Sequence, residues 1–290
     1  MDFHSEGDAR RGTRSHRVSL TDHETVVTQM GDDGPAVVLI HSMGVDRRMW
    51  EPVMPRLSAG RRVFAYDVRC HGEAVGAPIP FTMADTARDL LGVLDVLAVD
   101  RAHLVGLSLG GAIAQTAAVA WPDRFVSLAL LATTDHPFPD VFEARARSAE
   151  TEGMPAQVDG TLTRWFTPEA LAADGWAVRY ARECVERFDP AVWAATWRAY
   201  KSLDVMGRLD GFPGRILLMG GGSDVSAPPE FMAALAERIP GAHRQEVARA
   251  PHMLPLERPV EVAEILDRFL PADRPGTPAR CPDADPVPAR

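Results

Sequence analysis

The 290-residue sequence has few cysteines, no long apolar run and no excess of basic residues. Its three cysteines, Cys70, Cys184 and Cys281, are an odd number without Cys-x-x-Cys spacing, which argues against a disulfide framework and against a zinc site. No stretch reaches the roughly 18 apolar residues that span a bilayer, and the polar start MDFHSEGDARRGTRSHR lacks the apolar core of a signal peptide. We therefore expect a cytoplasmic protein with no metal and no membrane partner.

The charge balance is acidic. A formal net charge of −9 argues against a nucleic-acid-binding surface. With 46% hydrophobic and 24% charged residues, the composition is that of a globular protein with a sizeable core. These properties favour a small molecule as the partner.

The middle of the chain alternates between two kinds of pattern. Continuously apolar, β-rich runs are typical of strands that are buried on both faces. They alternate with helical patterns such as 82–99, where Thr82 and Asp85 have the spacing of a capping box. This alternation predicts an α/β fold with a mostly parallel sheet covered by helices on both faces. The buried strands are expected at 35–42, 61–68, 102–108, 126–133 and 215–221, after antiparallel edge strands at 18–20 and 25–31.

The alternation stops between residues 137 and 208. This segment is rich in Trp, Arg, Ala and Glu with helical spacing, and contains no convincing strand. We therefore expect a helical cap at 137–208, inserted into a core formed by 17–136 and 209–270, over the sheet edge where ligands bind in open α/β folds. Residues 1–16 and 271–290 lack apolar periodicity and are predicted to be disordered extensions.

The stretch RAHLVGLSLGGAIAQ (101–115) contains the pattern Gly-x-Ser-x-Gly, centred on Ser108. The pattern alone fits either a nucleophile or a tight glycine-rich joint. Its position between a predicted strand and a predicted helix favours the nucleophile, because a serine on such a turn is exposed at the top of the sheet.

A serine nucleophile needs a base to accept its proton. Among nine histidines, His252 is favoured, since it follows the strand-like segment 244–249 and precedes a predicted helix at 259–270. This places it at the same edge of the sheet as Ser108. The alternative is that His252 is a loop residue with a structural hydrogen bond, which is the role we expect for His71.

The base needs an acid to orient it. Asp224 follows the predicted strand 215–221 in a loop with three glycines, and the order Ser108, Asp224, His252 is the hydrolase order of nucleophile, acid and base. Asp135 also ends a strand and is the alternative acid. Asp67 fits a turn-stabilising residue better.

An oxyanion hole needs two N–H donors. The helix that starts at Leu109 offers one unpaired N–H group. The loop LIHSMGVDRRMW (39–50) supplies the second, which we assign to Met43. The alternative for this loop is a plain glycine turn.

Several segments resemble the α/β-hydrolase superfamily, and within it the 3-oxoadipate enol-lactonases. They are HSMGVDRRMW, RVFAYDVRCHGEA, FTMADTARDLLGVLD, RAHLVGLSLGGAIAQ, GTLTRWFTPEA and GGGSDVSAPPE, within roughly residues 17–271. The triad motifs are typical of the whole superfamily, whereas RWFTP (164–168), inside the expected cap, is more discriminating. The resemblance implies Ser108, Asp224 and His252 as the triad, Met43 and Leu109 as oxyanion donors, and no cofactor.

The resemblance also implies residues that contact the substrate. Trp165 becomes a candidate wall of the pocket, with plain packing as the alternative. An enol-lactone substrate of this family bears a carboxylate, so an acidic protein needs a local cation to hold it. Arg47, Arg48 and Arg164 are the candidates, and for each the alternative is a solvated surface arginine.

The resulting hypothesis is a serine hydrolase for a carboxylic ester or small lactone, with 3-oxoadipate enol-lactone as the most specific substrate. A general carboxylesterase or a cofactor-free haloperoxidase-type hydrolase would use the same triad. A ligand-binding protein on a hydrolase scaffold, or a lyase or cyclase of secondary metabolism, would use the same fold.

Overall fold

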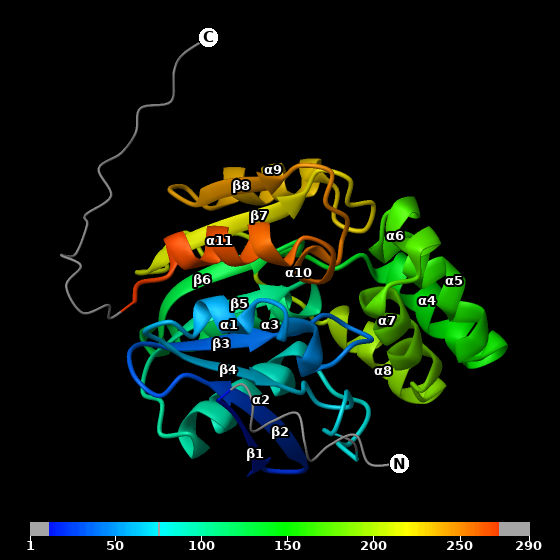
Figure 1. Cartoon of the computed structure of the whole chain (residues 1–290). Coiled ribbons are helices and arrows are strands. Elements are labelled where there is room, and N and C mark those ends of the chain that lie inside the picture. Colours follow the sequence, from blue (N-terminus) through cyan, green and yellow to red (C-terminus); the bar gives the residue numbers. More distant parts are fainter. Residues whose placement is uncertain (1–11, 75, 273–290) are drawn as a thin grey trace.

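The computed structural model describes residues 12–74 and 76–272 (Figure 1). Within them, eight strands form one sheet in the order β1-β2-β4-β3-β5-β6-β7-β8. The first two strands and the β2–β4 pair are antiparallel, and every other pair is parallel. The bounds are β1 (Thr13–Ser19), β2 (Glu24–Met30), β3 (Ala36–Ile40), β4 (Arg62–Tyr66), β5 (Ala102–Leu107), β6 (Phe125–Leu131), β7 (Arg215–Gly221) and β8 (His243–Val247).

The central strands are buried, as their continuous apolar runs predicted. Every residue of β3 and β5 is buried. Parallel strands are covered on both faces by the helices that connect them, so no polar alternation is needed. The predicted α/β fold, a mostly parallel sheet covered by helices on both faces, is confirmed.

The helices of the core follow the strands. Helix α2 starts with the predicted capping box, in which Thr82 accepts from the Asp85 N–H and the Asp85 side chain accepts from the Thr82 N–H. Helix α2 packs on α3, and α1 packs on α11. No helix in the described part of the chain has both the length and the apolar character of a membrane span. The bounds are η2 (Arg47–Trp50), α1 (Met54–Leu57), α2 (Met83–Val96), α3 (Leu109–Ala120), η3 (Pro122–Arg124), α9 (Pro229–Arg238), α10 (Leu254–Glu257) and α11 (Pro259–Phe269).

Five further helices, here called the cap helices, lie between β6 and β7 in the chain. Figure 1 shows them gathered in green at one end of the sheet. They fall inside the interval 137–208 expected for a cap, while the division into a core and a cap domain stays a prediction. The cap helices are α4 (Pro139–Glu152), α5 (Met154–Trp165), α6 (Pro168–Ala173), α7 (Trp176–Glu186) and α8 (Pro190–Tyr200).

The predicted N-terminal extension needs a correction. Residues 13–16 belong to β1, which pairs with β2 from Thr13 opposite Met30 onward, and His16 Nε2 lies 2.9 Å from Gln29 Oε1. The edge strand predicted at 18–20 therefore starts earlier, and its first residues were missed because polar side chains at a sheet edge stay in solvent and leave no apolar pattern. Residues 1–11, the tail 273–290 and Cys281 lie outside the described residues; Cys70 and Cys184 are free thiols.

Candidate active site

Ser108 occupies the turn between β5 and α3. Its φ of 53° and ψ of −111° are strained for a residue with a side chain. The flanking glycines permit close packing: a Cβ atom on Gly106 would lie 2.2 Å from the carbonyl oxygen of Gly110, and one on Gly110 would lie 2.1 Å from that of Ile40. The predicted glycine joint and the half-buried Ser108 are therefore parts of one turn.

Two hydrogen bonds from the neighbouring strand region hold this turn. The Ser108 N–H donates to the Leu131 carbonyl at 2.9 Å, and the Thr133 hydroxyl donates to the Ser108 carbonyl at 2.7 Å. Strained conformations persist where the surrounding structure over-determines them. These bonds supply that constraint and keep the serine at the start of α3.

Asp224 and His252 meet in the loops after β7 and β8. His252 Nδ1 lies 2.8 Å from Asp224 Oδ2, and both residues are buried. Asp224 Oδ1 accepts from the N–H groups of Ser226 at 2.7 Å and Ala227 at 3.0 Å. Because an ionised carboxylate only accepts hydrogen bonds, Nδ1 is the donor, and Nε2 is the ring nitrogen left to accept a proton.

The alternative acid, Asp135, has other partners. Its two oxygens accept from the Arg238 guanidinium at 2.7 and 2.8 Å, and His136 Nδ1 lies 2.8 Å from Asp135 Oδ1. Asp135 therefore holds an ion pair, and Asp224 is the carboxylate that the structure places beside His252. Asp67 is a turn residue as expected, since it accepts from the N–H groups of Arg47 at 2.9 Å and Glu73 at 2.8 Å.

His41 orients the peptide group that carries the Met43 N–H. Burial lowers the pKa of His41, so the ring is neutral. Its Nε2 accepts from the Val68 N–H at 2.9 Å, and its Nδ1 donates to the Ser42 carbonyl at 2.7 Å. In a trans peptide the carbonyl of Ser42 and the N–H of Met43 point in opposite directions. The bond from His41 thus fixes the direction of the Met43 N–H.

Both expected oxyanion donors are available. The hydrogen bonds found among the described residues do not use the Met43 N–H. Leu109 is the first residue of α3, where N–H groups have no acceptor within the helix. Developing negative charge on a substrate oxygen is what such unpaired donors stabilise.

A cavity of about 70 Å³ joins these groups, and we call it the Ser108 cavity. Ser108, Met43 and His252 line it from the core side. The cap helices and the segment leading into them cover it with aromatic side chains. These are Phe138, Phe142, Trp165, Trp193, Trp197 and Tyr200.

Trp165 therefore lies where the sequence placed it, in the wall of the cavity. Its carbonyl also accepts from the Met253 N–H at 3.1 Å, which joins α5 to the loop that carries His252. Two residues later, Thr167 donates from its N–H and its hydroxyl to the Glu257 carboxylate, at 3.0 and 2.7 Å. The RWFTP motif thus both lines the cavity and ties the cap helices to the core.

Arg145 and Arg164 line the Ser108 cavity, and the described residues provide neither of them with a counter-ion. Neither forms an ion pair within the described residues: Arg164 donates to the Thr161 hydroxyl at 3.1 Å, and the Arg145 guanidinium lies 4.6 Å from the centre of the Trp197 ring. Burial and the neighbouring Arg164 lower the pKa of Arg145 to about 10, and burial lowers the pKa of Arg164. Two guanidinium groups without an ion-pair partner among the described residues therefore line one partly desolvated cavity.

Arg47 does not line the Ser108 cavity, so the structure does not bring it together with Ser108, and a role of Arg47 in binding the substrate stays a prediction. Its guanidinium pairs with Asp67 and, at 2.6 Å, with Glu73. It lines a second cavity of about 560 Å³, here called the Arg47 groove, between core loops and helices α7 and α8. Arg48 lines the same groove and pairs with Asp46 at 2.6 Å.

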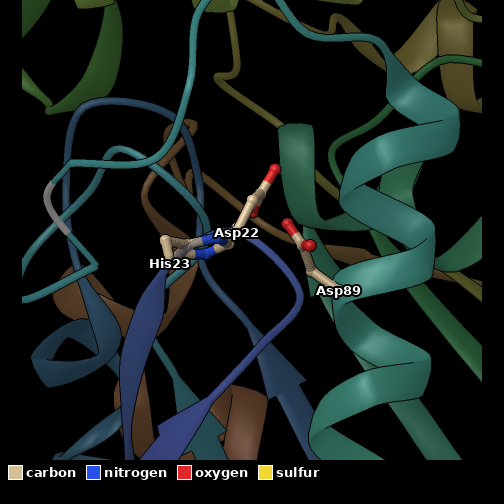
Figure 2. A group of neighbouring side chains, drawn as sticks. All are labelled: Asp22, His23 and Asp89. Atoms are coloured by element: carbon tan, nitrogen blue, oxygen red, sulfur yellow. Dashed lines mark hydrogen bonds and ion pairs between the residues drawn. The ribbon is translucent and has the colours of Figure 1, made fainter.

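Asp22, His23 and Asp89 form a cluster of three metal-ligand types (Figure 2). His23 Nδ1 lies 2.7 Å from Asp22 Oδ1. The Arg69 guanidinium donates to both Asp89 oxygens at 2.6 and 2.8 Å and lies 3.5 Å from Asp22. A guanidinium already neutralises these carboxylates and would repel a metal cation, so the cluster is an ion-pair network in which His23 and Asp89 are buried and Asp22 is exposed.

The sequence interpretation missed Arg145 and Tyr200. Arg145 follows Phe142 by three residues and precedes Ala149 by four, so it shares the buried face of α4. That spacing was a usable signal, but arginines are frequent throughout this segment. Tyr200 lies beside the hydroxyls of Thr133 and Ser108, and burial raises its pKa to about 12, so it is protonated at neutral pH.

Residues 37–265 match the family described as "Alpha/beta hydrolase family". The chain is 26% identical over 263 residues to 3-oxoadipate enol-lactonase 1 of Acinetobacter baylyi, covering 88% of this chain and 97% of the relative. It is 31% identical over 251 residues to RutD of Caulobacter segnis, named as a carbamate hydrolase, covering 82% and 92%.

Among solved structures, the enol-lactonase from Burkholderia xenovorans LB400 is 30% identical to this chain with a TM-score of 0.84, covering 88% of this chain and 99% of that one. The resemblance seen in the sequence motifs therefore extends to the whole fold. The family match spans most of the chain, from the first parallel strand to the last helix. The chain belongs to the alpha/beta hydrolase family.

Proposed function

We propose that the protein hydrolyses a small carboxylic ester or lactone, with Ser108 as the nucleophile. The observation that carries the proposal is one cavity lined by Ser108, on its strained turn, and by His252, whose Nδ1 is bonded to Asp224. A serine becomes nucleophilic when a base accepts its proton and a carboxylate orients that base. These three residues supply those parts.

The first half of the reaction forms an acyl-enzyme. Ser108 Oγ attacks the carbonyl carbon while its proton passes to His252 Nε2, and Asp224 stabilises the imidazolium. The N–H groups of Met43 and Leu109 hold the oxyanion. The carbon–oxygen bond of the ring then breaks, and His252 returns the proton to the leaving oxygen. From an enol lactone this leaving group is an enol, which becomes a ketone.

The second half releases the acid. A water molecule gives its proton to His252 and attacks the acyl carbon, and the same two N–H groups hold the second oxyanion. The bond to Ser108 then breaks, and His252 returns the proton to Ser108 Oγ. One water is consumed, and the product carries a new carboxylate.

The substrate proposed is an ester or lactone that carries a carboxylate, and 3-oxoadipate enol-lactone is the first candidate. Arg145 and Arg164 support it, because they place positive charge in the cavity without a protein counter-ion among the described residues. The names of the Acinetobacter and Burkholderia relatives also support a lactone. The name of the Caulobacter relative favours a carbamate as the competing substrate.

The test is turnover of 3-oxoadipate enol-lactone by the wild-type protein beside Ser108→Ala, with a neutral aryl ester and a carbamate as parallel substrates. We expect wild-type turnover that is fastest on the lactone and lost in the variant. If the wild-type protein hydrolyses only the neutral ester or only the carbamate, that compound replaces the lactone as the proposed substrate. The assignment of Ser108 as the nucleophile would then stand. Ligand binding without turnover, unchanged in Ser108→Ala, would overturn the hydrolase mechanism, as would conversion of the substrate without uptake of water.

A further inference from the structure

The loop that carries Met43 is held by the cap helices as well as by the core. We call residues 41–46 the oxyanion loop. At the end of this loop, the hydroxyl of Tyr180 in α7 accepts a hydrogen bond from the Asp46 N–H at 3.1 Å. The same hydroxyl lies 3.0 Å from the Asp46 carbonyl oxygen and 3.0 Å from Asp46 Oδ1, and it can donate its proton to either oxygen. Tyr180 and Asp46 are buried. One phenol therefore contacts the backbone and the side chain of the same residue.

The rest of the Asp46 carboxylate is also occupied. Arg48 donates to it from its N–H at 2.9 Å and from its guanidinium at 2.6 to 3.1 Å. Cys184, one helical turn after Tyr180 on α7, places its Sγ 3.6 Å from Asp46 Oδ2. The contact is thus a closed polar network, and α7 contributes two side chains to it from one face.

Two tryptophans of the cap helices pack against the middle of the oxyanion loop. Gly44 has a φ of +77°, and a Cβ atom on it would lie 2.8 Å from a ring atom of Trp193 and 2.9 Å from one of Trp165. The rings of α8 and α5 therefore pack directly against the loop backbone. Glycine is required here both by the backbone conformation and by the contact.

The Met43 N–H lies between these two sets of contacts. On the core side, His41 holds the Ser42 carbonyl; on the cap side, Trp165 and Trp193 contact Gly44 and Tyr180 holds Asp46. A peptide plane fixed at both ends cannot rotate unless one end moves. Shifts of about 1 Å in a catalytic group can cost about a hundredfold in rate.

We propose that Tyr180 is a positioning residue of the reaction: its hydroxyl ties cap helix α7 to Asp46 and so keeps the Met43 N–H directed into the Ser108 cavity. The inference rests on the proposed function, because it takes the Met43 N–H as an oxyanion donor. It adds that the cap helices do more than cover the substrate. They complete the part of the site that stabilises the transition state.

The test is Tyr180→Phe, which removes only the hydroxyl. The kcat for hydrolysis of p-nitrophenyl acetate should fall about tenfold, which is less than the 10²–10³-fold loss typical of a deleted oxyanion donor. The KM should stay within about twofold of the wild-type value. Binding of phenylboronic acid, which forms a tetrahedral adduct on a serine, should weaken by the same factor. Amide hydrogen exchange in residues 41–50 should become faster.

Tyr66→Phe is the matched control. Tyr66 is also buried, and its hydroxyl has no hydrogen-bond partner in the described part of the chain. It should keep wild-type kcat and wild-type exchange in the oxyanion loop. Thermal unfolding of both variants verifies that each is folded at the assay temperature.

The outcomes separate the two proposals. If Tyr180→Phe matches Tyr66→Phe in kcat and in loop exchange, or if the whole loss falls on KM, the positioning role is overturned. If wild type does not hydrolyse the ester, or Ser108→Ala hydrolyses it equally well, the proposed function fails on this probe. The exchange rates of residues 41–50 then still decide whether Tyr180 holds the loop.

Discussion

The Ser108 cavity and the Arg47 groove both lie where core loops meet the cap helices. They differ in whether the arginines that line them are paired with carboxylates. In the groove, Arg47 pairs with Asp67 and Glu73. In the cavity, Arg145 and Arg164 form no ion pair within the described residues. The smaller cavity holds the unpaired charge.

This comparison distinguishes arginines that are paired within the fold from arginines whose charge the proposed substrate would neutralise. Removing a charge from water is costly unless a partner compensates for it, so the groove arginines stabilise the fold only together with their carboxylates. Among the described residues the cavity arginines have no such carboxylate partner, and Ser108, the proposed nucleophile, has a strained φ of 53°. Strain and unpaired charge in one place are typical of functional sites, where stability is lower than it could be.

The largest effect is expected from changing Asp224, the proposed acid beside His252. Asp224→Asn should lower kcat about 10⁴-fold, because an amide cannot hold His252 in the tautomer that accepts the Ser108 proton. Asp135→Asn is the control, since Asp135 pairs with Arg238 in the way that the groove charges are paired. Steady-state kinetics on both variants measure this. An equal loss in Asp135→Asn would contradict the assignment of the acid.

A change in the Arg47 groove is expected to lower stability and to leave catalysis unaffected. Arg47→Gln leaves the fully buried Asp67 carboxylate without its ion pair, so the free energy of unfolding should fall by about 3–5 kcal/mol. The ratio of kcat/KM on an anionic ester to that on a neutral ester should not change. Urea unfolding measures the first quantity and kinetics the second.

Arg14→Gln, at an exposed ion pair with Asp32, serves as the control for Arg47→Gln and should lose at most about 1 kcal/mol. A changed ratio of anionic to neutral turnover in Arg47→Gln would show that the groove takes part in substrate selection. That result would remove the distinction between the two cavities.

A smaller effect is expected for Arg145→Gln. The kcat/KM for a carboxylate-bearing ester should fall about 10- to 100-fold, the range of one charge-assisted hydrogen bond, while that for a neutral ester of the same size stays unchanged. The Tm should not fall, because the change removes repulsion from Arg164. Arg147→Gln, on the exposed side of the same helix, is the matched control. Equal losses on both esters would argue for a packing role.

The smallest effect concerns pH. Burial alone would raise the pKa of Asp46, but hydrogen bonds and charge from Arg48 outweigh it and lower the pKa from 3.8 to about 2. The unfolded chain therefore binds more protons between these values, so this stabilisation is complete above about pH 4 and is lost as the pH falls toward 2.

Because Arg48 is partly exposed and screened by solvent, the lowered pKa of Asp46 should contribute about 1–2 kcal/mol to the free energy of unfolding. Urea unfolding at pH 5 and at pH 2.5 should show that Asp46→Asn loses less stability on acidification than wild type does, by this amount. Identical losses in the two proteins would mean that the Asp46–Arg48 pair contributes nothing measurable.

Much of the candidate site could be predicted because chain order implies position in this fold. Ser108 follows β5, Asp224 follows β7 and His252 follows β8. The carboxyl ends of neighbouring parallel strands meet at one edge of a sheet, so residues just after such strands come together. Their placement in one region is observed, while their catalytic roles stay predictions.

The arginines could not be assigned in this way. Arg47 was one of three candidate cations for an anionic substrate, but the direction of its side chain depends on Asp67, twenty residues later. Arg145 was missed because the helical cap has no fixed register against the core. Which face of α4 turns inward is settled by packing against other helices, and Arg145 lies on that face.

The sequence by itself therefore determined the α/β fold, the glycine-bounded turn at Ser108 and the order of the acid and the base. These depend on local conformation and on strand order, which apolar patterns and glycines encode directly. Only the tertiary structure decided which arginines are paired, which line the Ser108 cavity without an ion pair among the described residues, and that Tyr180 is hydrogen-bonded to Asp46. Those features arise from contacts between residues that are far apart in the chain, and the partner of a side chain is set by packing and not by its neighbours in sequence.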